Sequence, residues 1–170
     1  DYTDEKYHDL FTRNTKGGRL YADVPLGTLS VVSRGHALDR ITQAVLAQWA
    51  DAEIEDAPAT TDLNGKEVGS LRTACDFMCD GKRVEHKGSL LSWKTNHECF
   101  VLKFWKIKPG NFDVLYLSFM TPRGIHIFSV AKEQAVKHLG KPNRQGDSTL
   151  QVNAPRGKKG FKHFKDAETF

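Results

Sequence analysis

Three apolar segments follow one another between residues 99 and 130, and they constrain the fold more than any other feature of the sequence. They read CFVLKFWKI, FDVLYLSFM and GIHIFSV, and polar stretches that contain Pro109 and Pro122 separate them. Segments of this length that are rich in Val, Ile, Leu and Phe are typical of β-strands. Because the first two are apolar at most positions, we expect a sheet that is covered on both faces.

A helix is predicted before these strands. Leu38, Ile41 and Val45 recur at helical spacing, which indicates one helix over residues 37–51. Residues 28–33, with the sequence TLSVVS, are expected to form a short strand or an extended lead-in to that helix.

The remaining elements complete the predicted order of helix, strands, helix and strand. The segments TACDFMC and KRVEHKGSLLSW flank Asp80-Gly81, a dipeptide suited to the tight turn of a β-hairpin. A short helix is expected over residues 131–140, and a last strand over residues 148–154. This order predicts an α/β or α+β fold with a mixed central β-sheet flanked by helices. A small β-barrel is the less favoured alternative, because the first helix is strong.

The length and composition are those of one globular domain. The chain has 170 residues, of which 39% are hydrophobic and 27% charged. We therefore expect a single domain over residues 1–170, with a core over 35–154 and a basic tail over 155–170. No apolar run approaches the ~20 residues of a membrane span, so no membrane partner is expected. The odd number of cysteines suggests an intracellular location, in a cytoplasm or inside a host cell.

The predicted hairpin carries charged side chains that suit metal chemistry. Glu85 and Lys87 must point to the same face of the second strand, because strand side chains alternate. Asp76 lies on the preceding strand, so its carboxylate and that of Glu85 can converge on one Mg²⁺ ion. The backbone carbonyl of His86 would supply a further oxygen ligand. Lys87 would then stabilise phosphate charge, or position and deprotonate the attacking water.

This arrangement resembles the signature of the PD-(D/E)XK nucleases, here as Asp76 followed by Glu85-His86-Lys87 after a glycine-turn hairpin. The similarity covers roughly residues 35–154 and is greatest to the type II restriction endonucleases. The resemblance implies a restriction-endonuclease-like fold and a Mg²⁺-dependent enzyme that hydrolyses DNA, with Mn²⁺ as a substitute metal. Asp76, Glu85 and Lys87 would be the catalytic residues.

Three further residues bear on that resemblance. Ala74-Cys75 stand where the proline of the family signature would precede the first aspartate. Asp80 is a rival for the first carboxylate, but its place in the turn argues against it. Members of the family often carry an acidic residue on the first helix that reaches the metal, and Asp39 is the candidate here.

Contacts with nucleic acid are expected from basic residues on one strand and in the tail. These residues are Lys103, Arg156, Lys158, Lys159 and Lys162. Lysine and arginine bind phosphates whatever the base sequence, so the affinity should fall steeply with salt. Because a restriction enzyme that cuts both strands of a symmetric site usually works as a dimer, the resemblance also implies a homodimer on double-stranded DNA.

Three alternatives stay open. The same chemistry would serve a structure-selective nuclease of repair, recombination or phage replication. The second alternative is a non-enzymatic nucleic-acid-binding module that uses the basic tail, with or without a zinc ion held by Cys75, Cys79, His97 and Cys99. Without either function, the acidic and basic side chains of the second hairpin strand would form an exposed ion pair.

Other side chains have plainer interpretations. Trp49, Trp93 and Trp105 are interpreted as packing residues rather than as platforms for base stacking. Ser89 is expected on the face of Glu85, either lining the site or as an ordinary strand serine. The sequence contains no P-loop and no G-x-G-x-x-G pattern, so no nucleotide cofactor is expected.

Overall fold

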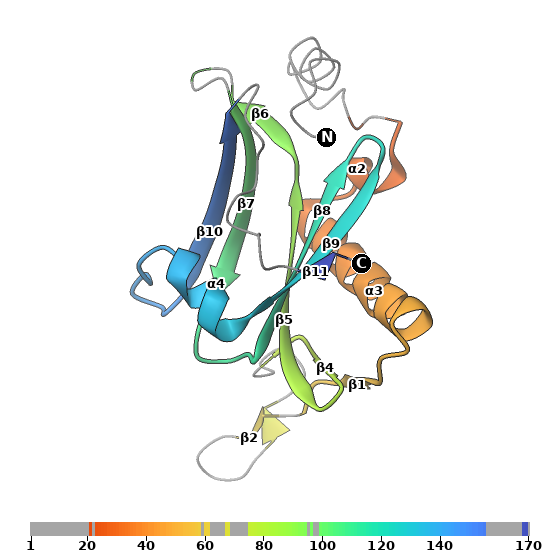
Figure 1. Cartoon of the computed structure of the whole chain (residues 1–170), viewed down its shortest axis with the longest axis vertical. Coiled ribbons are helices and arrows are strands. Elements are labelled where there is room, and N and C mark those ends of the chain that lie inside the picture. The colour runs from red at the N-terminus through yellow and green to blue at the C-terminus, as the bar shows by residue number, and fades with distance from the viewer. Residues whose placement is uncertain are drawn as a thin grey trace.

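The computed structural model describes residues 21, 23–58, 60–61, 67–68, 75–94, 96, 99–155 and 168–169. The helices are α2 (Pro25–Thr28), α3 (Val31–Trp49) and α4 (Lys132–His138). The strands are β1 (Ile54–Asp56), β2 (Thr60–Thr61), β3 (Glu67–Val68), β4 (Phe77–Cys79), β5 (Lys82–Leu90), β6 (Ser92–Lys94), β7 (Cys99–Ile107), β8 (Val114–Thr121), β9 (Gly124–Ala131), β10 (Ser148–Pro155) and β11 (Glu168–Thr169). The fold is mixed α+β, with one long helix and many strands (Figure 1).

The described strands form two larger sheets and one short ribbon. The larger sheet has the order β1-β4-β5-β8-β9-β11, and the second sheet has the order β10-β7-β6. Strands β5 and β8 pair in parallel, whereas the other neighbours in these two sheets pair antiparallel. The ribbon consists of β2 and β3. The larger sheet is therefore mixed, as the sequence predicted.

Helix α3 begins six residues earlier than its apolar pattern indicated. The side chain of Ser30 accepts a hydrogen bond from the backbone N–H of Ser33 at 3.1 Å, which caps the helix. The prediction that residues 28–33 are extended is wrong, because this cap starts the helix at Val31. Val31 and Val32 belong to a residue type that favours strands, so their pattern predicts an extended segment where the cap instead starts a helix.

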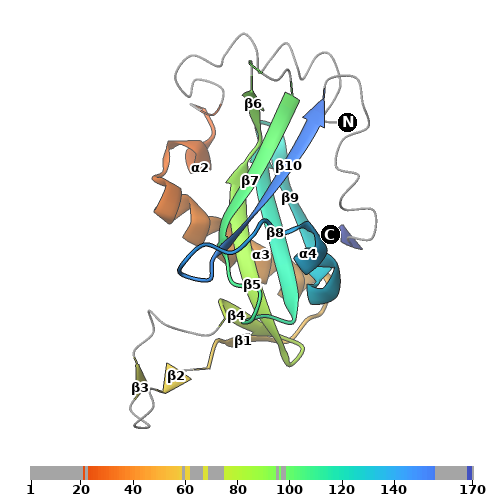
Figure 2. The same cartoon turned by 90° about the vertical axis from the view of Figure 1, so that its left-hand side faces the viewer.

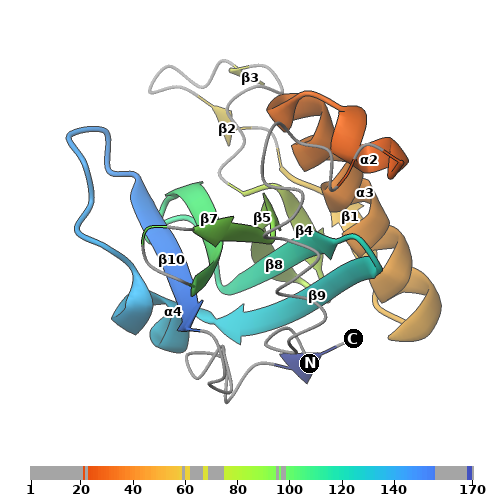
Figure 3. The ribbon, with the colours of Figure 1, turned by 90° about the horizontal axis from the view of Figure 1, so that it is seen from above.

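Helix α3 covers one face of the larger sheet. Leu38, Thr42 and Leu46 follow one another at a spacing of four residues and are buried. Leu46 packs in a cluster with Phe77, Val84, Tyr116 and Ile127 of β4, β5, β8 and β9. The helix lies on the opposite side of these strands from β7 and β10 (Figure 3).

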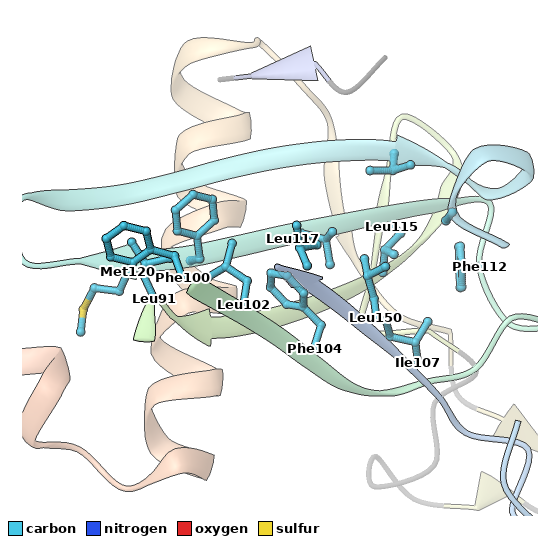
Figure 4. Packing of buried hydrophobic residues seen from close by; sticks show 14 of the residues in the cluster. Leu91, Phe100, Leu102, Phe104, Ile107, Phe112, Leu115, Leu117, Met120 and Leu150 are labelled. Atoms are coloured by element: carbon cyan, nitrogen blue, oxygen red, sulfur yellow. The ribbon is translucent and has the colours of Figure 1, made fainter. Parts of the chain in front are cut away.

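The second sheet covers the other face. Leu115 and Leu117 of β8 share a buried cluster with Leu102 of β7 and Leu150 of β10. Figure 4 shows these side chains meeting between the sheets, and Figure 2 shows β7 and β10 lying across β8 and β9. Because alternate residues of β8 face the helix and the second sheet, this strand is buried on both sides, as its apolar pattern predicted.

Helix α4 contributes the buried Ala135 to the same cluster, so a helix lies on this face too, but the second sheet covers most of it. The chain passes from β5 to β6 with the single residue Leu91 between them, so it leaves the larger sheet at that point and enters the second. Strand β7 consequently belongs to the second sheet rather than to the central one. Where an extended chain runs on from one sheet into another, the two sheets meet at a corner.

The hairpin prediction is confirmed. Strands β4 and β5 pair up to Cys79↔Lys82, so a two-residue turn joins them. Asp80 and Gly81 both have positive φ angles, of 48° and 71°. This is the backbone of a type I′ turn, for which Asp-Gly is well suited.

Candidate functional site

The candidate site begins where β4 leaves the edge of β5. Asp76, the residue before β4, donates its backbone N–H to Val84 O at 2.8 Å. Further along β5, the backbone N–H of His86 donates to Asp76 Oδ2 at 2.7 Å. Strand β4 does not extend to His86, so the side-chain carboxylate of Asp76 accepts the hydrogen bond that a backbone carbonyl of a paired strand would accept. This bond holds the carboxylate beside β5.

Three oxygen atoms converge next to this edge. Lys87 Nζ lies 2.6 Å from Glu85 Oε1 and 3.2 Å from Asp76 Oδ2. It also donates a hydrogen bond to the backbone carbonyl of His86 at 2.9 Å. The hairpin and the alternation of β5 therefore bring together the four residues that the sequence singled out, while their roles stay a prediction.

Two of the three charged side chains are largely buried, and the third, Asp76, is partly open to solvent. The side chains of Glu85, Lys87 and Asp76 are 8%, 20% and 37% exposed. Burial raises the pKa of Glu85, although the Lys87 ammonium opposes that shift. Burial alone would lower the pKa of Lys87, but the charges of Asp76 and Glu85 outweigh it, so the pKa is raised and the ammonium is stabilised.

This burial contradicts the alternative of an exposed ion pair formed by Glu85 and Lys87. Removing the Glu85 carboxylate and the Lys87 ammonium from water costs free energy that apolar packing at the same place would not cost. Groups of this kind are enriched at functional sites, where their charge serves binding or catalysis.

The donor atoms suit a hard divalent cation. The carboxylates of Asp76 and Glu85 and the carbonyl of His86 already share one cation, the Lys87 ammonium. Mg²⁺ binds oxygen ligands of these types and commonly keeps water and substrate phosphate as its others. Among the described residues, no three His, Cys, Asp or Glu side chains form a metal centre. An ion here would therefore depend on the backbone carbonyl, water and phosphate as well as on the two carboxylates.

The side chain of His86 anchors β5 to α3. Its Nε2 lies 2.8 Å from Ser118 Oγ and 3.2 Å from Thr42 Oγ1, and its Nδ1 lies 3.4 Å from Asp39 Oδ1. Burial lowers the pKa of His86 to about 4. The ring is therefore neutral at neutral pH and packs in the interior.

Asp39 lies on α3 beside the group. Burial, followed by the charge of Asp76, raises the pKa of Asp39 to about 6. Its carboxylate accepts a hydrogen bond from Gln43 at 3.3 Å and faces the ring of His86. Asp39 and Asp76 line the same pocket, whereas a role for Asp39 as a metal ligand stays a prediction.

An open pocket of about 390 Å³ lies over the group. Lys87 contributes to its floor, Val31 and His36 to the wall formed by α3, and Trp105 and Lys106 to the wall formed by β7. Strand β5 runs between these two elements (Figure 1). The pocket gives a substrate access to the Lys87 ammonium and to Asp76 from solvent.

The interpretation of the tryptophans as packing residues was right for one of the three. Trp93 is buried, but Trp105 and Trp49 are 57% and 84% exposed. Trp105 lines the pocket and is the residue of the candidate site that sequence reasoning missed. One signal in the sequence indicated that Trp105 is exposed. Lys106 directly follows it at a position where the alternation of polar and apolar residues along β7 calls for an apolar one.

Of the residues predicted to bind nucleic acid, the structure describes Lys103. Its backbone N–H and carbonyl are hydrogen-bonded to Ser89 Oγ at 3.2 and 3.1 Å, which ties β7 to β5. Its Nζ lies 3.7 Å from the centre of the Trp105 ring. The remaining predicted residues lie outside the described part of the chain; they are Arg156, Lys158, Lys159 and Lys162.

The structure gives no support to the zinc alternative. Cys75, Cys79 and Cys99 are buried free thiols, and His97 lies outside the described residues. Cys79 is on β4 of the larger sheet, whereas Cys99 is on β7 of the second sheet. Packing in the core accounts for such buried cysteines.

No protein-family model matches the chain, and no curated protein is significantly similar to it. In the described segments, no helix has both the length and the apolar character needed to cross a membrane. The resemblance to the PD-(D/E)XK nucleases therefore rests on Asp76, Glu85 and Lys87 and on the hairpin that carries them.

Proposed function

We propose that this protein is a Mg²⁺-dependent endonuclease that hydrolyses phosphodiester bonds of DNA. One observation carries the proposal: two carboxylates and a backbone carbonyl converge on the Lys87 ammonium beneath an open pocket. This set combines oxygen ligands for a divalent cation with a cationic group for the substrate phosphate. A restriction-endonuclease-like fold belongs to the same proposal.

Each residue of the group has a task in this reaction. Asp76, Glu85 and the carbonyl of His86 would hold the metal. When bound, Mg²⁺ lowers the pKa of water and offsets negative charge on the phosphoryl oxygens. Lys87, freed from the carboxylates, would donate a hydrogen bond to the scissile phosphate or orient the attacking water. The water oxygen loses a proton to solvent and forms the new bond to phosphorus. The bond to the 3′ oxygen breaks and that oxygen takes up a proton, leaving a 5′-phosphate and a 3′-hydroxyl.

Two forms of this activity are candidates. The first is a homodimeric type II restriction-like enzyme that cuts double-stranded DNA at a specific site. The second is a structure-selective nuclease of repair, recombination or phage replication. One observation favours the second form: Trp105 is exposed at the pocket, where it is available to an unpaired base.

The test is cleavage of a panel of labelled DNA substrates with Mg²⁺. The panel consists of a long natural duplex, a flapped duplex, a four-way junction and a single strand. Discrete fragments from the duplex support the restriction form, and cleavage confined to flapped, branched or single-stranded DNA supports the second. Glu85→Gln should abolish cleavage, whereas Glu55→Gln, which alters an exposed carboxylate of β1, should not. If every substrate stays intact, the proposal is wrong and a non-enzymatic module is favoured.

A further inference from the structure

The pocket over the charged group continues along β5 as a groove. A second pocket, of about 230 Å³, shares Val31, Gly35, Gly88 and Trp105 with the first. It extends past the end of β5 to Ser92. The two pockets therefore form one groove, with the first turns of α3 on one side and β7 on the other.

A β-bulge shapes the β7 wall of this groove. Between the pairs Ser148↔Ile107 and Leu150↔Phe104, strand β7 has one residue more than β10. Lys106 lies in this stretch and has a φ of 57°, which is uncommon for a residue with a side chain. A bulge re-aims side chains, and Trp105 and Lys106 are both exposed although they are consecutive.

The wall is aromatic and cationic. The Trp105 ring is 57% exposed, and Lys103 Nζ lies 3.7 Å from its centre. In the second pocket the charged lining residues are Arg34 and Lys103, both basic. The acidic residues of the groove, Asp39 and Asp76, line the first pocket, beside the proposed metal. Away from that end, the groove is therefore complementary to a polyanion.

We infer that this groove binds an unpaired, single-stranded segment of DNA, with one base stacked on the face of Trp105 opposite Lys103 and the backbone phosphates next to Lys103 and Lys106. Exposed aromatic rings stack on bases of any sequence, and nearby cations bind the phosphates. A base inside a duplex has both faces covered by its neighbours, so it offers Trp105 nothing to stack on. The inference rests on the proposed function for the scissile phosphate, which it places beside Asp76.

Gly35 provides a way to close the groove without disturbing the protein. It lines both pockets, and a Cβ atom added to it would meet no other atom within 4 Å. A larger residue at this helical position is also favoured over glycine by its helix propensity. Gly35→Gln should therefore fill the groove in a fully folded protein, and Gly35→Ala is the matched change that leaves most of the groove open.

The experiment measures binding without cleavage, by fluorescence anisotropy in EDTA. The probes are a fluorescein-labelled ten-nucleotide thymidine strand and a blunt duplex of ten base pairs. We expect the full chain to bind the single strand at least about tenfold more tightly than the duplex. Trp105→Ala should weaken single-strand binding by about 5- to 150-fold, the range for one lost stacking contact. Gly35→Gln should weaken it as well, and Gly35→Ala should have little effect.

The matched control is Trp49→Ala. Trp49 is 84% exposed at the C-terminal end of α3 and lines neither pocket, so its loss should not change binding. Circular dichroism melts show whether each variant is folded. Equal affinity for duplex and single strand would overturn the inference. So would unchanged single-strand binding by folded Trp105→Ala or Gly35→Gln.

Failure of this inference and failure of the proposed function give different results. A protein that cleaves DNA, but binds single strands equally well with and without Trp105, is a nuclease whose groove has another occupant. A protein that binds single strands through Trp105, but cleaves nothing with Mg²⁺, uses the groove as inferred and is not the proposed enzyme.

Discussion

Asp76 Oδ2 accepts a hydrogen bond of 2.7 Å from the backbone N–H of His86, so the carboxylate completes the edge of β5 while it also faces the Lys87 ammonium. The Asp76 side chain therefore has two tasks. It accepts a hydrogen bond from the backbone of β5, and in the proposed reaction it binds the metal. These two tasks need different chemistry, because an amide oxygen can accept the hydrogen bond but is a weaker ligand for Mg²⁺.

Asp76→Asn should therefore separate folding from activity. Its amide oxygen can still accept from the backbone of β5, so unfolding by urea should change by less than about 1 kcal/mol relative to the native chain. Asp76→Ala leaves the N–H without its partner and should cost about 1–2 kcal/mol. Both variants should lose about 100-fold or more of the cleavage rate. An Asp76→Asn protein with the native rate would remove this residue from the metal site.

Lys87→Met should make the protein dependent on divalent metal for its stability. Without the ammonium, the buried carboxylate of Glu85 is left unpaired beside the more exposed carboxylate of Asp76, at a cost of about 3 kcal/mol at neutral pH. Mg²⁺ would replace the lost cation and, at 100 times its dissociation constant, restore about 2.7 kcal/mol. The measurement is the thermal midpoint with and without Mg²⁺.

Lys82→Met is the control for that experiment, because Lys82 is an exposed lysine on the same strand. Its thermal midpoint should be close to that of the native chain and should not respond more strongly to Mg²⁺. The double variant Glu85→Gln/Lys87→Met should lose most of the response. If all variants respond alike, then Mg²⁺ binds elsewhere.

Asp39 and His86 should give the protein opposite responses to acid. The pKa of His86 is lowered from 6.5 to about 4, so the unfolded chain takes up this proton first and stability is lost as the pH falls from 6.5 to 4. The pKa of Asp39 is raised from 3.8 to about 6, so the folded chain takes up that proton first and stability is gained as the pH falls from 6 to 3.8.

In the native chain the contributions of Asp39 and His86 to the pH dependence of stability oppose each other. A substitution at either residue removes its contribution, so the other one can be measured. Between pH 7 and pH 4.5, Asp39→Asn should lose on the order of 2 kcal/mol relative to the native chain. His86→Gln should shift in the other direction, towards greater relative stability in acid. Urea unfolding at the two pH values measures both shifts. Shifts of the same sign would contradict the assignment of the two pKa values.

Gly88→Ala and Gly35→Ala should change stability in opposite directions. A Cβ atom at Gly88 would lie 2.7 Å from Cδ1 of Leu38, which is buried between α3 and β5, so the Leu38 side chain or α3 would have to move. We expect a loss of about 1–3 kcal/mol in unfolding free energy. Gly35 has open space at the same atom, so its replacement should add about 0.5–1 kcal/mol. Equal effects in urea unfolding would place α3 differently on the sheet.

Local patterns explain what could be predicted from the sequence. The hairpin depends on Asp80-Gly81, whose positive φ angles are a property of two neighbouring residues. The grouping of Asp76, Glu85 and Lys87 follows from that turn together with strand alternation. Neither step requires knowledge of the rest of the chain.

The features that were missed depend on distant parts of the chain. An apolar strand such as β7 packs equally well in either sheet, and its place was decided by the crossing of the chain at Leu91. The exposure of Trp105 depends on a bulge against β10, which is more than forty residues away. The convergence of three oxygens on the Lys87 ammonium is likewise a matter of geometry, because spacing alone also fits an exposed ion pair.

The most direct test of the central claim is nicking of a supercoiled plasmid with Mg²⁺ by the native chain, Lys87→Ala and Lys82→Ala, each with an EDTA control. The native chain and Lys82→Ala should convert the plasmid to nicked, linear or smaller forms. Lys87→Ala and EDTA should prevent this conversion. An intact plasmid with the native chain, or full cleavage by Lys87→Ala or in EDTA, would show that this group of residues is not the active site of a Mg²⁺-dependent nuclease.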